Sequence, residues 1–184
     1  MMRVAMSGDR ALIQIVDAAL AEAARKSGAW LVCRPGCTEC CMGPFPITQL
    51  DARRLREGLA ELERRDRQRA ARVRERARQA VAQLATDDDP CPALDPATGT
   101  CDLYAARPIT CRIFGPPVRY GSDAVGICEL CFTGASDEEI AACQVEVDAG
   151  LESQLSNEVE ESTGVRGETS VAFALAGASE AAPR

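Results

Sequence analysis

Four cysteines lie within nine residues, in the stretch CRPGCTECC that contains Cys33, Cys37, Cys40 and Cys41. Thiols spaced this closely can belong to an apolar core, to a disulfide framework or to a set of metal ligands. The proline and glycine residues around them predict a loop, which offers little interior for core packing. The spacing Cys37-x-x-Cys40 lets two thiols curl around one ion, so the stretch favours metal ligation.

The adjacent pair Cys40 and Cys41 is the unusual part of this stretch. Neighbouring side chains point in different directions in both extended and helical backbone. We therefore expect that the two do not sit symmetrically on one tetrahedral ion. Either the two thiols bind two different metals, or one binds the metal and the other lies outside the direct ligands and supports it.

Further candidate ligands follow downstream, at Cys91, Cys101, Cys111, Cys128 and Cys131. The spacing Cys128-x-x-Cys131 repeats that of Cys37-x-x-Cys40 and suggests metal ligation. The alternative interpretation of this pair is a dithiol redox pair. Such redox motifs sit in a βαβ context, which this chain does not show. The tenth cysteine, Cys143, falls on the apolar stripe of a predicted helix, so we assign it to the core and not to the ligands.

The chain has ten cysteines and no histidine. Serine and cysteine nucleophiles usually rely on a histidine base, so a catalytic triad of that kind is excluded. All-thiolate sites favour zinc, iron–sulfur clusters or copper(I). No apolar run approaches the ~20 residues of a membrane span, and charges interrupt the N-terminal apolar run. We therefore expect a cytoplasmic protein, in a compartment where cysteine clusters hold metal more often than they form structural disulfides.

Mostly helical elements are predicted around the cysteines. A helix is expected over 9–27, and a helical hairpin arm, as one helix or two, over 48–85 with Thr48 as its cap. A C-terminal helix is expected over 136–160, because Ser136 and Glu139 can form a capping box.

The segment from 90 to 133 between these helices is irregular. Leu94 and Leu103 flank a turn and predict a short β-hairpin, and Pro108 suits the first position of a short helix. We expect a mostly α fold, a helical bundle or hairpin arm around a small Cys-rich module from 30–46 and 90–133. Residues 1–162 are expected to form a single domain, followed by a poorly ordered tail over 163–184.

The run from Cys91 to Arg112 reads Cys-Pro-Ala-Leu, Cys-Asp-Leu-Tyr and Arg-Pro-x-x-Cys-Arg in turn. Together with CRPGCTECC it resembles the two halves of the CxxCxxCC cysteine-cluster family, which is described as zinc- or iron-chelating. The resemblance implies chelation by the seven cysteines from Cys33 to Cys111. One departure is that three residues, and not two, separate Cys33 from Cys37. A larger relative methylates flagellin lysines, but the glycine-rich βαβ unit for S-adenosylmethionine is not found here.

Positive side chains near the cysteines could balance charge. Four thiolates on one divalent ion carry a formal charge of about −2, which is costly in a dry interior without nearby donors. Arg107 and Arg112 lie close in sequence to Cys111 and could supply such donors. An equal alternative is that Arg107 pairs with an ordinary surface carboxylate.

The net charge of −7 is unevenly distributed. Residues 51–78 hold eleven arginines and six acidic residues. Because the acidic residues lie within helical reach of the arginines, the pattern predicts a salt-bridged, solvated face and not a nucleic-acid site. We expect this arm to project away from the metal site.

These observations predict a cytoplasmic metal-binding protein without catalysis of its own, whose protein partner cannot be named. Its cofactor would be an iron–sulfur cluster, with 4Fe–4S favoured, or zinc, because seven to nine thiols exceed what one zinc ion needs. The alternative is an iron–sulfur redox enzyme or enzyme subunit. CRPGCTECC would be half of a ligand set completed by sulfurs from Cys91, Cys101 and Cys111.

Overall fold

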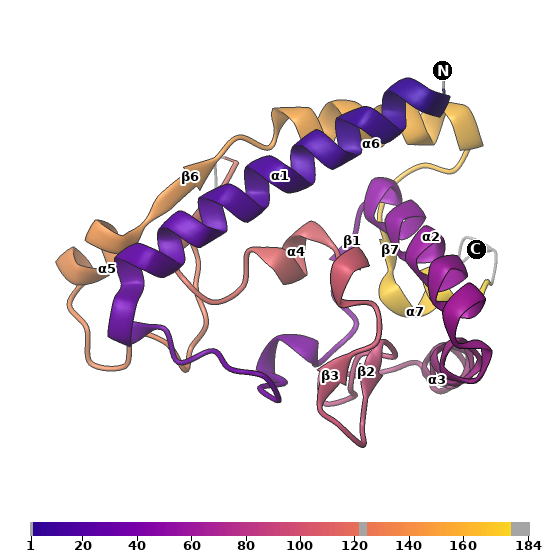
Figure 1. The fold of residues 1–184 in the computed structure, drawn as a ribbon, viewed down its shortest axis with the longest axis horizontal. Coiled ribbons are helices and arrows are strands. Elements are labelled where there is room, and N and C mark those ends of the chain that lie inside the picture. Colours follow the sequence, from indigo (N-terminus) through magenta and orange to yellow (C-terminus); the bar gives the residue numbers. More distant parts are fainter. Residues whose placement is uncertain (1, 122–124, 178–184) are drawn as a thin grey trace. The chain divides into compact units, whose positions relative to one another are not determined.

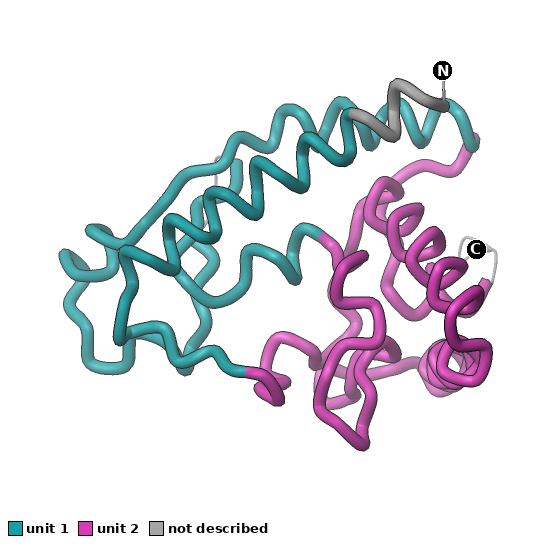
Figure 2. The backbone as a smooth tube through the Cα atoms, in the orientation of Figure 1, with its two compact units in different colours: residues 1–34, 109–163 teal, residues 35–108, 164–184 magenta. Residues whose placement is uncertain are grey.

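The computed structural model describes residues 2–121 and 125–177, and this part of the chain is mostly helical, as expected (Figure 1). It forms two compact units, each built from two separate stretches of sequence (Figure 2). Unit 1 comprises residues 1–34 and 109–163, and unit 2 comprises residues 35–108 and 164–184. The chain leaves unit 1 after residue 34 and returns to it at residue 109, and the single domain expected over 1–162 stays a prediction.

Unit 1 is organised around one long helix. Its elements are α1 (Met2–Ser27), η1 (Gly28–Trp30), α4 (Ile109–Arg112), β4 (Val118–Tyr120), β5 (Val125–Gly126), α5 (Asp137–Cys143), β6 (Val145–Val147) and α6 (Gly150–Thr163). The apolar stripe predicted for the first helix is buried at Leu12 and Val16. Helix α1 contacts α4, α5, β6 and α6, so it is the central element of this unit.

The prediction of one continuous helix over 136–160 is wrong in the middle of that range. The capping box is present, with Ser136 Oγ accepting from the Glu139 amide and the Glu139 carboxylate accepting from the Ser136 amide. However, α5 ends at Cys143, and Val145–Val147 forms β6, which pairs in parallel with β4. In β6 the first and third residues are buried and the second is exposed, so an alternating strand pattern replaces the helical one.

Unit 2 contains the helical hairpin and most of the cysteine-rich loops. Its elements are η2 (Glu39–Cys41), β1 (Pro46–Ile47), α2 (Gln49–Arg65), α3 (Arg67–Gln83), β2 (Leu94–Asp95), β3 (Thr100–Cys101), η3 (Tyr104–Ala106), β7 (Thr169–Ser170) and α7 (Val171–Ala176). Strands β2 and β3 form the short antiparallel hairpin predicted from the sequence.

The helical hairpin has two helices, and side-chain caps set where each begins. Thr48 Oγ1 accepts from the Asp51 amide at 3.2 Å at the start of α2. Asp66 leaves the helical conformation, with φ −149° and ψ 91°, and its side chain caps α3 by accepting from the Arg69 amide at 2.9 Å. The charged middle of the predicted arm is therefore a break between two helices.

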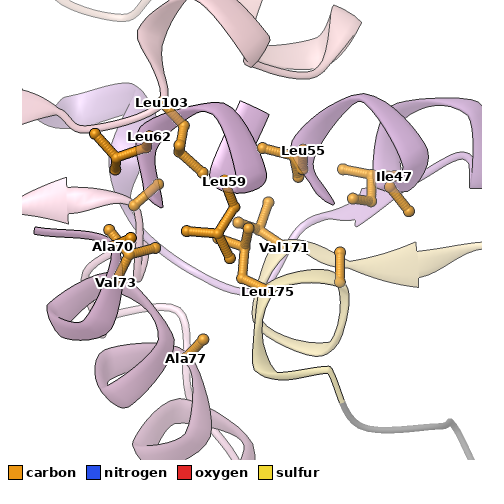
Figure 3. Packing of buried hydrophobic residues seen from close by; sticks show 13 residues of the cluster. Ile47, Leu55, Leu59, Leu62, Ala70, Val73, Ala77, Leu103, Val171 and Leu175 are labelled. Carbon is orange, nitrogen blue, oxygen red and sulfur yellow. The ribbon is translucent and has the colours of Figure 1, made fainter. Parts of the chain in front are cut away.

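The core of unit 2 includes residues that we expected in a poorly ordered tail. Strand β7 pairs with β1, and α7 packs against α2 and α3. Leu59 of α2 lies against Val171 and Leu175 of α7, which are 5% and 2% exposed (Figure 3). Residues 169–176 thus belong to the folded unit, because they supply apolar surface that covers the helical hairpin. Residues 178–184 of the expected tail lie outside the described residues.

Among the described residues, no helix combines the length and the apolar character that a membrane span requires.

Candidate metal centre

The backbone brings the two halves of the cysteine motif together inside unit 2. The Cys91 amide donates to the Cys41 carbonyl at 2.7 Å, and the Gly43 amide donates to the Asp89 carbonyl at 2.9 Å. Between them, Met42 and Pro90 form an antiparallel bridge. Residues fifty positions apart in sequence are thereby held side by side, as a shared ligand set requires.

Gly43 allows this close approach. It has φ +80°, and a Cβ at this position would lie 3.4 Å from the Asp87 Cα. A larger residue would be strained by its backbone conformation and would press on the turn that contains Asp87. The glycine that ends the cysteine loop is therefore explained by the joining of the two halves.

Cys40 and Cys41 do not diverge as expected. They lie in η2, and their thiols share a hydrogen bond. This bond lowers the pKa of Cys40 to about 6 and raises the pKa of Cys41. The adjacent pair therefore presents two sulfurs to one place, with Cys40 as the thiolate and Cys41 as the hydrogen-bond donor.

Cys91 lies in a tight turn whose amides face its sulfur. The amides of Ala93 and Leu94 hydrogen-bond to the thiol, and the Leu94 amide also donates to the Cys91 carbonyl at 2.9 Å. Burial nevertheless raises the pKa of Cys91 to about 11 in the metal-free chain. Cys101 lies opposite Leu94 in the β2–β3 hairpin, and burial likewise raises its pKa.

These four sulfurs occupy one region of unit 2. Negative charge on Cys91 and Cys101 raises the pKa of Cys41, and charge on Cys40 raises that of Cys101. Cys37 belongs to the same loop. In residues 2–121 and 125–177, no three cysteine or carboxylate side chains are arranged to hold an ion as they stand. The chain thus gathers soft donors of the right chemistry in unit 2 without displaying a finished coordination geometry.

Arg107 and Arg112, the two arginines expected to balance charge, have different surroundings. The positive charge of Arg107 adds to the lowering of the pKa of Cys40 and offsets part of the burial that raises the pKa of Cys101, and its guanidinium lies 3.9 Å from the centre of the Tyr104 ring. Arg112 belongs to unit 1, where its Nη1 donates to Asp17 at 2.8 Å. Arg107 therefore acts electrostatically on the thiols of unit 2, whereas the ion pair of Arg112 fastens α4 to α1.

A buried carboxylate that was not among the predicted site residues lies next to Cys101 in the sequence. Asp102, whose side chain is 1% exposed, directly follows Cys101 and binds two arginines of α3. Arg76 Nη2 donates to Asp102 at 2.6 Å, Arg76 Nε donates to the Pro92 carbonyl at 2.9 Å, and Arg69 pairs with the other carboxylate oxygen. We expected the helical arm to project away from the site. Instead α3 contacts it, because Arg76 hydrogen-bonds to Pro92 and Asp102, the residues that follow Cys91 and Cys101.

The remaining candidate ligands belong to unit 1: Cys33, Cys111, Cys128 and Cys131. Cys128 and Cys131 are both buried, and Cys33 is exposed. Cys143, assigned to the core, is also buried, and its thiol donates to the Lys26 carbonyl at 3.3 Å. The nine candidates therefore divide between the two units, with five thiols in unit 2 and four in unit 1.

Comparison with known proteins places the chain in a family. The model of a family called CxxCxxCC, described as "Putative zinc- or iron-chelating domain", matches residues 32–132, which is more than half of the chain. This range contains all nine candidate ligands and ends before Cys143. No curated protein and no solved structure matches the chain significantly.

Proposed function

Because the chain belongs to the CxxCxxCC family of zinc- or iron-chelating domains, we propose that it is a cytoplasmic metal-binding protein that holds an iron–sulfur cluster. One observation carries the proposal: the hydrogen bond from the Cys91 amide to the Cys41 carbonyl, at 2.7 Å, unites the two cysteine segments. The neighbouring hydrogen bond from the Gly43 amide to the Asp89 carbonyl, at 2.9 Å, supports the same junction.

The residues proposed to hold the cluster in unit 2 are Cys40, Cys41, Cys91 and Cys101, with Cys37 as a further donor from the same loop. Their chemistry fits, because thiolates are the usual ligands of such clusters. Amides that hydrogen-bond to the sulfurs of Cys91 and Cys101 would stabilise their thiolate forms. When bound, the cluster would supply an electron-transfer centre or a structural cross-link.

The number of sulfurs supports a cluster over a single zinc ion in this unit. A zinc ion takes four ligands, and unit 2 offers five thiols and, like the whole chain, no histidine. The positive charge of Arg107 beside Cys40 and Cys101 would offset part of the negative charge of a thiolate-bound centre.

Anaerobic purification followed by elemental analysis tests the proposal. Iron and acid-labile sulfide should copurify with the protein, and visible absorbance should bleach when dithionite is added. Cys40→Ser and Cys101→Ser should each remove most of the iron, whereas Cys143→Ala should retain it. Zinc in place of iron would refute the cluster and leave a zinc-binding protein. Protein that retains neither metal, and that cannot be reconstituted with either, would refute the proposed function.

A further inference from the structure

Two turns, one in each unit, place backbone amides on a cysteine sulfur in the same way. In unit 2 the turn spans Cys91 to Leu94, and in unit 1 it spans Cys128 to Cys131. In both, the amide of the fourth residue donates to the carbonyl of the first at 2.9 Å. In both, the amides of the third and fourth residues also hydrogen-bond to the sulfur of the first. Such amides stabilise a thiolate and orient it as a metal ligand.

The turn in unit 1 carries a second thiol, because its fourth residue is itself a cysteine. The thiols of Cys128 and Cys131 share a hydrogen bond, and each residue is only 4% exposed. The following residue, Phe132, has φ +60°, which is rare for a bulky side chain. A bent conformation of this kind persists only where surrounding contacts enforce it.

Those contacts fasten the turn to the segment that leads to Cys33. The Phe132 amide donates to the Trp30 carbonyl at 3.3 Å, and the two rings stack with their centres 6.0 Å apart. Leu31 packs on the same cluster of Cys128, Cys131 and Phe132. The backbone just before Cys33 is thus fixed against the two buried thiols.

Gly115 lies close to both Cys33 and Cys128. Its carbonyl accepts from the Cys128 amide at 3.1 Å, and a Cβ on Gly115 would lie 3.3 Å from Cys33 Sγ. Cys111 lies four residues before this glycine in α4. The ion pair of Arg112 with Asp17 anchors that helix to α1.

From these contacts we propose that unit 1 carries a second metal site, separate from the centre in unit 2, in which Cys33, Cys111, Cys128 and Cys131 bind one soft divalent cation such as Zn²⁺. Four thiolates satisfy the tetrahedral coordination of zinc, and each thiol releases its proton on binding. Because no three of the described cysteine or carboxylate side chains surround an ion as they stand, binding would also draw the four sulfurs together. Cys143 is close by in the same buried cluster but lies outside the set, because its thiol is used by the Lys26 carbonyl. The site does not depend on the function proposed for unit 2.

Titration of the reduced, metal-free chain with Cd²⁺, followed by its thiolate charge-transfer absorbance, tests the second site. The chain with Cys40→Ser, Cys91→Ser and Cys101→Ser should still bind about one equivalent of Cd²⁺. Adding Cys128→Ser and Cys131→Ser to it should abolish that binding, whereas adding Cys143→Ala should not. Loss of all Cd²⁺ binding in the triple variant, while the wild-type chain binds, would overturn the proposal.

A spectrum of the wild-type chain keeps the test decisive even if a variant fails to fold. Cadmium-113 NMR of the loaded protein should show a four-sulfur resonance that survives in the triple variant and disappears when Cys128 and Cys131 are replaced. A wild-type spectrum whose resonances all disappear in the Cys128→Ser, Cys131→Ser chain would indicate one shared site and overturn the proposal. Failure of the function proposed for unit 2 would look different, because iron would then be absent while the unit 1 resonance remained.

Discussion

Arg76 Nη2 lies 2.6 Å from Asp102 Oδ2, and this pair connects helix α3 to the β2–β3 hairpin that carries Cys101. The same guanidinium donates through Nε to the carbonyl of Pro92, the residue after Cys91. One side chain thus fixes the spacing of two candidate ligands that are ten residues apart. Because the Asp102 side chain is buried away from water, its negative charge depends on the ion pairs with Arg69 and Arg76 for stabilisation.

Arg76→Ala should therefore weaken both the fold and the metal centre of unit 2. We expect the free energy of unfolding to fall by about 1–3 kcal/mol, since a buried carboxylate loses one of its two partners and the Pro92 carbonyl loses a donor. Urea unfolding of the metal-free chain and the rate of metal loss to a chelator measure the two effects. Arg78→Ala is the control, because Arg78 is exposed on the same helix and pairs with Glu75. Equal effects from the two variants would contradict the role of Arg76.

Gly58 marks the place where helix α2 passes closest to η3. A Cβ at Gly58 would lie 2.3 Å from the Ala106 Cβ, far inside van der Waals contact. Alanine in a helix is ordinarily about 1 kcal/mol better than glycine, but overpacking costs about 1–3 kcal/mol. Gly58→Ala should thus lower the melting temperature, and Ala106→Gly in the same chain should restore it. A Gly58→Ala chain that is more stable than wild type would show that η3 does not press on the helix.

Gly115 offers a test of the contact between Cys33 and the Cys128 turn. Gly115→Ala should weaken Cd²⁺ binding at the unit 1 site, because the new Cβ would meet Cys33 Sγ at 3.3 Å. Gly134→Ala separates this contact from backbone strain, since Gly134 also has a positive φ but no atom within 4 Å of its added Cβ. Cd²⁺ titration of the two variants is the measurement. Equal weakening in both would trace the effect to strain alone.

Cys40 should react faster than Cys91 in the metal-free protein at neutral pH. Its pKa is lowered to about 6 by the hydrogen bond from Cys41, so it is ionised at pH 7, whereas burial raises the pKa of Cys91 to about 11. Iodoacetamide labelling read by mass spectrometry should modify Cys40 before Cys91, and its rate should fall as the pH drops through about 6. Cys41→Ala removes the donor and should slow labelling of Cys40 at pH 7. Preferential labelling of Cys91 would reverse the assignment.

The same lowered pKa has a consequence for the stability of the metal-free chain. A thiol whose pKa is lower in the folded than in the unfolded chain stabilises the fold above its unfolded value, near 8.5. That contribution is lost as the pH falls through about 6. The difference in free energy of unfolding between wild type and Cys41→Ala should therefore shrink as the pH falls from about 9 to 6.

Features set by neighbouring residues could be predicted from the sequence. The caps at Thr48 and Ser136 and the β2–β3 hairpin depend on side chains within a few positions of the backbone they satisfy. The candidate cysteines could be proposed for the same reason, since spacing, composition and turn residues are all visible locally, and their binding of metal stays a prediction. The buried position of Cys143 also followed from its place on an apolar stripe.

Features set by distant partners could not be predicted. Val147 lies four positions after Cys143, which suits a helical stripe, but its segment pairs instead with the distant strand β4. Asp102 gives no sign in the sequence that it is buried, because its partners Arg69 and Arg76 lie 33 and 26 positions away. The hydrogen bond between the Cys40 and Cys41 thiols was not predicted, because the short 3-10 helix η2 turns the backbone differently from a strand or a regular helix.

The return of the chain to unit 2 through β7 and α7 sets an order of events during translation. A ribosome releases the whole of unit 1 and every candidate ligand before it releases Val171 and Leu175, which complete the core around the helical hairpin. Unit 2 therefore cannot complete its interior until the segment that follows unit 1 in the sequence has been made. The thiols of unit 2 are synthesised before the helix that closes its hydrophobic core, and unit 2 is completed only after the chain of unit 1.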